Sequence, residues 1–185
     1  MDGKHRMTAE LVGYRLTRAE WEVLRLLLTL PDTCRLFQFP LDETAERRAV
    51  EQLTELGLLT PGGENTLVDE LFAFMVESLS EAFHMLLIES VGHRLALCQC
   101  PSLAMLAEQD AKHMTLTPLP NAASGAELLL RGLERLPVPR KCFTGAPGEA
   151  LMPVVAFTDA DDPETACFLR QILEDFTVPR PLLIE

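Results

Sequence analysis

The spacing of apolar residues predicts an amphipathic helix near the start of the chain. The run Thr17-Arg18-Ala19-Glu20 is a capping box, in which two side chains satisfy backbone N–H groups at a helix start. Trp21, Leu24 and Leu28 then recur on one helical face, so we expect a half-buried helix that ends before Pro31. The same apolar stripe is widened by Val23, Leu27 and Leu30.

A second helix and the segment after it follow the order of the back half of a winged helix. Asp42 or Thr44 can cap this helix, and Gly57 supplies a left-handed residue that ends it. The apolar pair Leu58-Leu59 and the turn Pro61-Gly62-Gly63 then predict a short strand and a glycine-rich turn. The buried side of the helix should consist of Ala45, Ala49, Val50, Leu53 and Leu56.

The third predicted helix is apolar nearly all round. It should open from Thr66, with Asp69 and Glu70 in its first turn, where the positive end of the helix dipole favours carboxylates. Such a helix lies between two layers or meets a partner, and we favour an interior position for the apolar surplus from Phe72 to Phe83. The apolar residues are Leu67, Leu71, Phe72, Phe74, Met75, Val76 and Leu79.

The pattern then changes to short apolar segments between turns, which predicts an antiparallel meander of about four strands. Turn signals occur at Val91-Gly92-His93, Pro101-Ser102 and Gln109-Asp110-Ala111. The third segment could also be helical because its leucine, alanine and methionine residues have good helix propensity, but we interpret it as a strand. The four segments run from Phe83 to Glu89, Arg94 to Cys100, Leu103 to Gln109 and Met114 to Leu119.

The last third of the chain predicts helix, loop, strand and helix. A second capping box, Ser124-Gly125-Ala126-Glu127, leads into a leucine-rich helix that ends at Pro137. Residues 137–150 are rich in proline and glycine, so we predict a mobile loop that acts as a hinge or linker. Met152 to Phe157 is typical of a buried strand, and Asp162-Pro163 of a helix start. That last helix should bury Leu169, Ile172, Leu173 and Phe176.

These elements predict one α+β domain over residues 1–185, with the meander packed by helices and a C-terminal strand–helix unit. Its sub-blocks would be a winged-helix-like part at 1–66, a sheet with helices at 67–136, and a loop followed by the strand–helix unit at 137–185. The sequence leaves the order of the strands and the oligomeric state open, and a homo-oligomer is compatible with it.

Charge and composition indicate a cytoplasmic protein without a nucleic-acid or membrane partner. The net charge is −12, and neither half of the chain has an excess of basic residues. The polar start from Met1 to Met7 is unlike a secretory signal, and no apolar run approaches the roughly 20 residues of a membrane span. The five scattered cysteines are expected to be reduced thiols that act as small core side chains.

A zinc site at Cys98-Gln99-Cys100, with His84, His93 and His113, is the first candidate for chemistry. Two residues that are two apart in a strand share one face, whereas structural zinc loops favour longer spacings on tight turns. We therefore interpret these cysteines as core thiols and predict no metal-binding residue.

The acidic run Thr158-Asp159-Ala160-Asp161-Asp162 is the second candidate, because carboxylates at the end of a strand can serve magnesium or phosphoryl chemistry. Capping of the last helix by Asp161 or Asp162 explains it more simply. No nucleophile or phosphate-loop motif accompanies it, although Ser102 or Cys142 would suit a nucleophile if a base lay nearby. We predict no catalytic or cofactor-binding residue and no cofactor.

Charge also decides how the winged-helix-like block is interpreted. A helix that reads DNA lies against phosphates, but here only Arg47 and Arg48 are basic. We expect them to lie on a solvated face with ion pairs such as Glu43–Arg47 and Arg47–Glu51. The carboxylates of this helix belong to Asp42, Glu43, Glu46, Glu51 and Glu55.

The order of the first 120 residues resembles the EspG-type chaperones of mycobacterial type VII secretion. The resemblance rests on the N-terminal helix, a strand-like segment from Leu36 to Phe39, the run Ala45-Glu46-Arg47-Arg48-Ala49 and its end at Leu56-Gly57-Leu58-Leu59. A leucine-rich helix like Leu128 to Leu133 follows, as in that family. The resemblance implies a cytosolic protein that binds a partner through its sheet and adjacent loops, and it assigns no binding residue.

The sequence therefore favours a non-catalytic protein-binding adaptor or secretion-type chaperone, whose partner and binding residues are unknown. One alternative is a transcriptional regulator in which residues 14–66 bind DNA and the C-terminal part senses a ligand or dimerises. Another is a small hydrolase or transferase that uses Asp159, Asp161 or Cys142.

Overall fold

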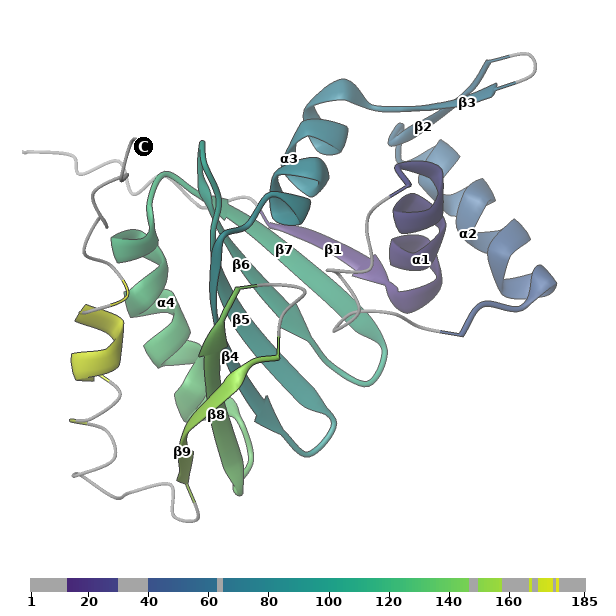
Figure 1. Ribbon diagram of the computed structural model, residues 1–185. Helices are drawn as coiled ribbons and strands as arrows, with labels where there is room; N and C mark the ends of the chain where they lie inside the picture. The colour runs from purple at the N-terminus through teal and green to yellow at the C-terminus, as the bar shows by residue number, and fades with distance from the viewer. Residues whose placement is uncertain are drawn as a thin grey trace, which may run out of the picture.

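A computed structural model of the chain describes residues 13–29, 40–62, 65–146 and 150–157, together with the helical residues 167, 170–174 and 176. Its main element is a seven-stranded antiparallel sheet with the order β1-β7-β6-β5-β4-β8-β9 (Figure 1). The strands are β1 (Tyr14–Thr17), β4 (His84–Ser90), β5 (His93–Gln99), β6 (Ala104–Gln109), β7 (His113–Leu119), β8 (Arg140–Gly145) and β9 (Met152–Phe157).

The predicted meander is confirmed as β4-β5-β6-β7, in which each strand pairs antiparallel with the next. Gly92 sits in the turn between β4 and β5 with a φ of 73°, a left-handed conformation that glycine adopts without steric cost. The segment from Leu103 to Gln109 contains strand β6 and not a helix. Its central place in the sheet outweighs its helix propensity, because Ala104 to Ala107 are buried and pack between β5 and β7.

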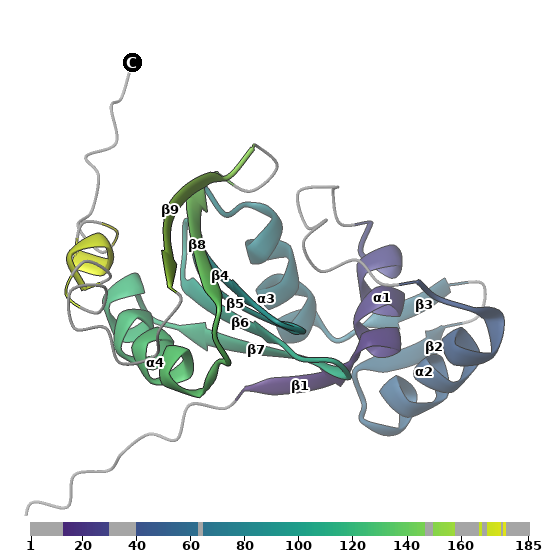
Figure 2. The same cartoon turned by 90° about the horizontal axis from the view of Figure 1, so that it is seen from below.

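The sheet carries a hydrophobic core on each face, because successive strand residues point to opposite sides. On one face, Leu87 belongs to a core shared with Trp21 of α1 (Arg18–Leu27), Leu53 of α2 (Glu43–Glu55) and Phe72 of α3 (Glu70–Ser80). On the other face lie α4 (Ala122–Arg135) and the C-terminal helical residues (Figure 2). The protein is therefore built of three layers.

The starts of the first two helices follow the sequence prediction. The hydroxyl of Thr17 accepts a hydrogen bond from the N–H of Glu20, and the carboxylate of Glu20 accepts one from the N–H of Thr17. Asp42 caps α2, and Gly57 ends it with a φ of 73°. Leu56 was expected on the buried side but is exposed, because it is the C-cap and lies beyond the last turn that packs.

A hairpin of two short strands, β2 (Leu59–Gly62) and β3 (Asn65–Val68), follows α2. The strand and turn predicted after α2 are thus present, whereas the winged helix as a whole remains a prediction, and the expected strand from Leu36 to Phe39 lies outside the described residues. The prediction of a helix from Thr66 is wrong. Thr66 pairs with Pro61 in the hairpin, and α3 begins only after its cap, Asp69.

Helix α4 begins three residues earlier than its sequence suggests. Its N-cap is Asn121, whose side-chain oxygen accepts a hydrogen bond from the N–H of Ser124, so Ser124 is not the cap. Gly125 and Gly132 face the sheet closely: a Cβ added to either would lie under 3.0 Å from Leu97 or Leu95. Glycine at these two positions lets the helix backbone approach the sheet.

Two predictions for the last third of the chain are wrong. Residues 140–145 are not a loop but strand β8, which pairs with β4 on one side and β9 on the other. Strand β9 lies at the edge of the described sheet, and Met152, Pro153 and Ala156 are exposed, so it is not the buried strand that the sequence predicts. Proline and glycine at its ends made the segment look irregular, whereas the strand itself, RKCFTG, contains only its final glycine.

Near the C-terminus, Leu173 and Phe176 are buried in the core under α4, as predicted. The predicted helix start at Asp162-Pro163 and the acidic residues Asp159 and Asp161 lie outside the described residues. Among the residues that are described, no helix is both long enough and apolar enough to cross a membrane.

Candidate protein-binding surface

Helix α3 is held in place by its cap and by one apolar side. The carboxylate of Asp69 accepts a hydrogen bond from the N–H of Phe72 at 2.9 Å. The ring of Phe72 is fully buried and meets the ring of Tyr14 edge-on, with 5.0 Å between the ring centroids. Met75, Val76 and Leu79 complete the buried side. The inner side therefore fixes the orientation of the whole helix.

The opposite side of α3 exposes two large apolar side chains. Leu71 is 69% exposed and Phe74 is 52% exposed, and residues three apart are neighbours on a helix surface. Glu70 and Glu77 are exposed beside them, four residues before and three residues after Phe74. We call the surface formed by Glu70, Leu71, Phe74 and Glu77 the outer face of α3. The preferred interpretation of α3 as an interior helix is therefore wrong, because only one side of it is covered.

Further apolar side chains are exposed at both ends of α3. Leu67, in strand β3, is 60% exposed, and Phe83, between α3 and β4, is 56% exposed. Phe83 also borders a hollow of about 410 Å³ between the turn after β5 and the start of α4. The apolar surplus noted in the sequence is thus partly at the surface.

The segment of the chain that contains α3 is strongly negative. Residues 41–82 contain ten carboxylate side chains and two arginines, a net charge of −8 out of −12 for the whole chain. Within the described part of the chain, neither Glu70 nor Glu77 forms an ion pair. An apolar pair with a line of carboxylates along one edge suits a ligand that carries positive charge.

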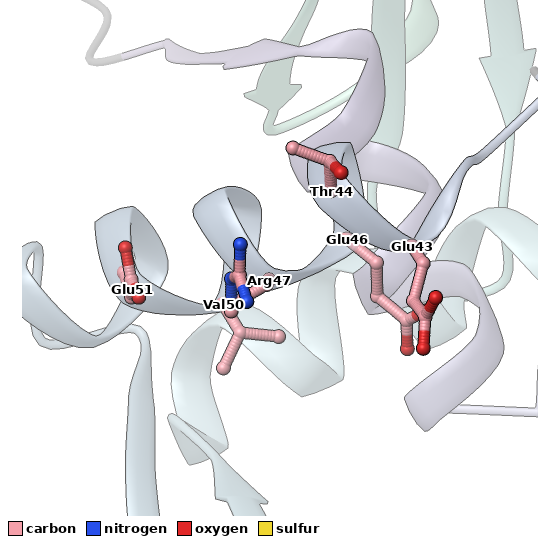
Figure 3. Close-up of a pocket in the computed structure, with 6 residues that line it drawn as sticks. All are labelled: Glu43, Thr44, Glu46, Arg47, Val50 and Glu51. Atoms are coloured by element: carbon pink, nitrogen blue, oxygen red, sulfur yellow. The ribbon is translucent and has the colours of Figure 1, made fainter.

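Helix α2 shows the same imbalance. Figure 3 shows side chains along one side of it, with Glu43 and Glu46 near its N-terminal end and Glu51 further along, around Arg47. They line a hollow of about 570 Å³, and every described residue of its lining comes from α2. Arg47 and Arg48 are exposed, as predicted, but the described residues show no ion pair of Arg47 with Glu43 or Glu51.

The cysteines and histidines considered for zinc do not converge. Cys98 and Cys100 are buried at the end of the β5 strand, as expected of core thiols. His84 lies at that end of the sheet, where its ring stacks on Phe176, whereas His93 begins β5 at the other end. No group of three or more potential metal ligands occurs among the described residues.

The proposed nucleophile Cys142 is buried in strand β8 beneath α4. Burial disfavours the charged thiolate and raises the pKa of this thiol to about 12, so it is protonated at neutral pH. Ser102 lies exposed in the turn between β5 and β6. Unlike the other described cysteines, Cys167 is exposed. The prediction that it is a core thiol is therefore wrong.

The sequence supplied the residues of the outer face of α3 without assigning them a role. The sequence shows that α3 has an excess of apolar residues. Which of them are buried depends on how the helix packs against the sheet, and the sequence does not show this. The useful signal is the spacing Glu70, Leu71, Phe74, Glu77, in which apolar and acidic residues share one helical side.

Comparison with known proteins finds a likeness in structure and none in sequence. No protein-family model and no curated protein matches the sequence. A structure of the Mycobacterium tuberculosis type VII secretion system chaperone EspG5, solved in complex with the PE25–PPE41 dimer, is similar with a TM-score of 0.49 and 14% sequence identity. The match covers 69% of this chain and 53% of that chain, so this protein spans about half the length of the chaperone. The structural resemblance is weak.

Proposed function

We propose that this protein is a non-catalytic adaptor or secretion-type chaperone that binds another protein. The observation that carries the proposal is the outer face of α3, where Leu71 and Phe74 are exposed on a helix whose inner side is firmly packed. Fully burying a leucine or phenylalanine side chain against a partner contributes about 1.5–3 kcal/mol. Two such anchors on one rigid helix are a suitable centre for an interface.

Charge supports a protein ligand over a nucleic acid. A DNA-binding surface neutralises phosphates with lysine and arginine, and the elements that would form a winged helix here carry an excess of carboxylates. Arg47, the basic residue at the centre of the hollow on α2, is surrounded by Glu43, Glu46 and Glu51. We therefore favour the adaptor over the transcriptional regulator.

The test is a comparison of partners retained by the immobilised full-length protein and by the variant L71S/F74S. We expect the wild type to retain at least one protein from lysate of its own cells, and L71S/F74S to lose it. Both substitutions are at exposed sites, so the fold should persist, which circular dichroism can check.

The matched control is Val91→Ser, which removes an exposed apolar side chain at the turn between β4 and β5. This variant should retain the same partner as the wild type. Equal retention by all three proteins would show that binding occurs elsewhere. A wild-type protein that retains nothing above a bait-free control would contradict the proposed function itself.

A further inference from the structure

We infer that the outer face of α3 docks a basic amphipathic helix of a partner protein. This inference rests on the proposed function and specifies the chemistry of the partner. It follows from the position of the carboxylates around the two exposed apolar side chains, and from the net charge of the segment to which they belong.

The first argument is geometric. Phe74 has Leu71 three residues before it, Glu70 four residues before it and Glu77 three residues after it, so all three are its neighbours on the helix surface. A ligand that covers the exposed ring of Phe74 must also lie against both carboxylates. Glu81, the exposed C-cap, continues the acidic line beyond Glu77.

The second argument is desolvation. A carboxylate that loses water in an interface is costly unless a cation or hydrogen-bond donors replace that water. Lysine or arginine side chains along one edge of the partner's apolar stripe would pair with Glu70 and Glu77, which lie on the same edge of α3, while leucine-like side chains cover Leu71 and Phe74. A second copy of this chain would bring like charges together, because the segment 41–82 has a net charge of −8.

The shape of the face favours a helix as the ligand. Leu71 and Phe74 lie one turn apart on a regular helix of 11 residues, and such ridges pack into the grooves of another helix. Helices that bind in this way present apolar anchors at intervals of three and four residues. Positive charge on their flanks would also speed the encounter, and would make it sensitive to salt.

The experiment uses two synthetic helical peptides of about 18 residues, long enough to extend beyond α3. In the first, leucines form one face and lysines the other, and in the second each lysine is replaced by glutamate. Fluorescence anisotropy measures binding of each to the full-length protein. We expect the lysine peptide to bind at least about tenfold more tightly, and its advantage to fall between about 20 mM and about 0.3 M salt.

The decisive variant is E70K/E77K, with E127K/E134K as its control. Glu127 and Glu134 are exposed on α4, on the other side of the sheet, and have the same spacing of seven residues. Both variants change the net charge by the same amount. E70K/E77K should lose about tenfold in affinity for the lysine peptide and gain affinity for the glutamate peptide, whereas E127K/E134K should stay within about twofold of the wild type.

Four results would overturn the inference. Equal losses in E70K/E77K and E127K/E134K would show a general attraction to an acidic protein. Undiminished binding of the lysine peptide by L71S/F74S would place the site elsewhere. A wild-type dimer in sedimentation that L71S/F74S abolishes would make a second copy the occupant. If a partner from lysate depends on Leu71 and Phe74 but E70K/E77K retains it, the proposed function stands and only the basic helix is wrong.

Discussion

Asp110 caps the turn between β6 and β7 with its carboxylate. The hydrogen bond that it accepts from the backbone N–H of Lys112 lowers its pKa most. Partial burial raises the pKa, and the N–H and ring of His113 lower it further. A carboxyl group whose pKa is lowered on folding stabilises the protein above its unfolded pKa, and this stabilisation is lost as the pH falls through the lower, folded value.

We therefore predict that Asp110→Ala lowers the free energy of unfolding at neutral pH by about 1–2 kcal/mol, since two backbone hydrogen bonds lose their acceptor. The difference from the wild type should shrink as the pH falls below about 4. Urea unfolding at a series of pH values measures it. Glu108→Ala, at an exposed neighbouring position in β6, is the control and should change little. A loss of the same size at every pH would mean that the carboxylate charge is not responsible.

Cys142 and Cys167 should differ greatly in reactivity. Only the thiolate reacts with an alkylating agent, and a thiol whose pKa is about 12 has only about one thiolate in 10⁴ at about pH 8. We predict that iodoacetamide labels the exposed Cys167 quickly and Cys142 very slowly in the native protein, as peptide mass spectrometry would show. In urea the two rates should become similar. Rapid native labelling of Cys142 would contradict its burial in the core under α4.

At the scale of the elements, the sequence predicts where most helices and strands lie but not how each is used. The meander could be predicted because its apolar segments are separated by clear turn signals. Strand β8 could not be predicted, because the proline and glycine residues around it are typical of a loop, although its six residues pair with β4 and β9. The outer face of α3 could not be predicted for a different reason: which side of an all-round apolar helix is covered depends on its neighbours.

The start of α4 tests how far local signals decide an element. Ser124 and Glu127 match a capping box, yet Asn121 caps the helix, because residues 122–124 continue the helical backbone and bring Ala122 into the core. We predict that Asn121→Ala lowers the free energy of unfolding by about 1 kcal/mol, and that Ser124→Ala lowers it by much less. Urea midpoints of both variants measure this. A larger loss of stability in Ser124→Ala than in Asn121→Ala would mean that Ser124 caps the helix, as the sequence predicts.

At the scale of the whole molecule, an excess of negative charge opposes the compact state. With a net charge of −12, about two-thirds of it within residues 41–82, repulsion between carboxylates should weaken when salt screens it. We predict that the urea midpoint rises between about 10 mM and about 0.3 M sodium chloride, a range over which the screening length falls severalfold. The variant E127K/E134K, which carries less net charge, should show a smaller rise. A midpoint that falls with salt would mean that attractive ion pairs dominate instead.

The position of β1 determines how late in protein synthesis one edge of the sheet can form. Among the described strands, β1 lies at one edge of the sheet and pairs with β7 alone, so that Arg15 is opposite Thr115, a hundred residues later in the chain. A ribosome that adds about 5–20 residues per second needs roughly 5–20 seconds to supply that partner after β1 has been synthesised. Until β7 has been synthesised, β1 therefore has no β7 strand to pair with, and this edge of the sheet cannot form.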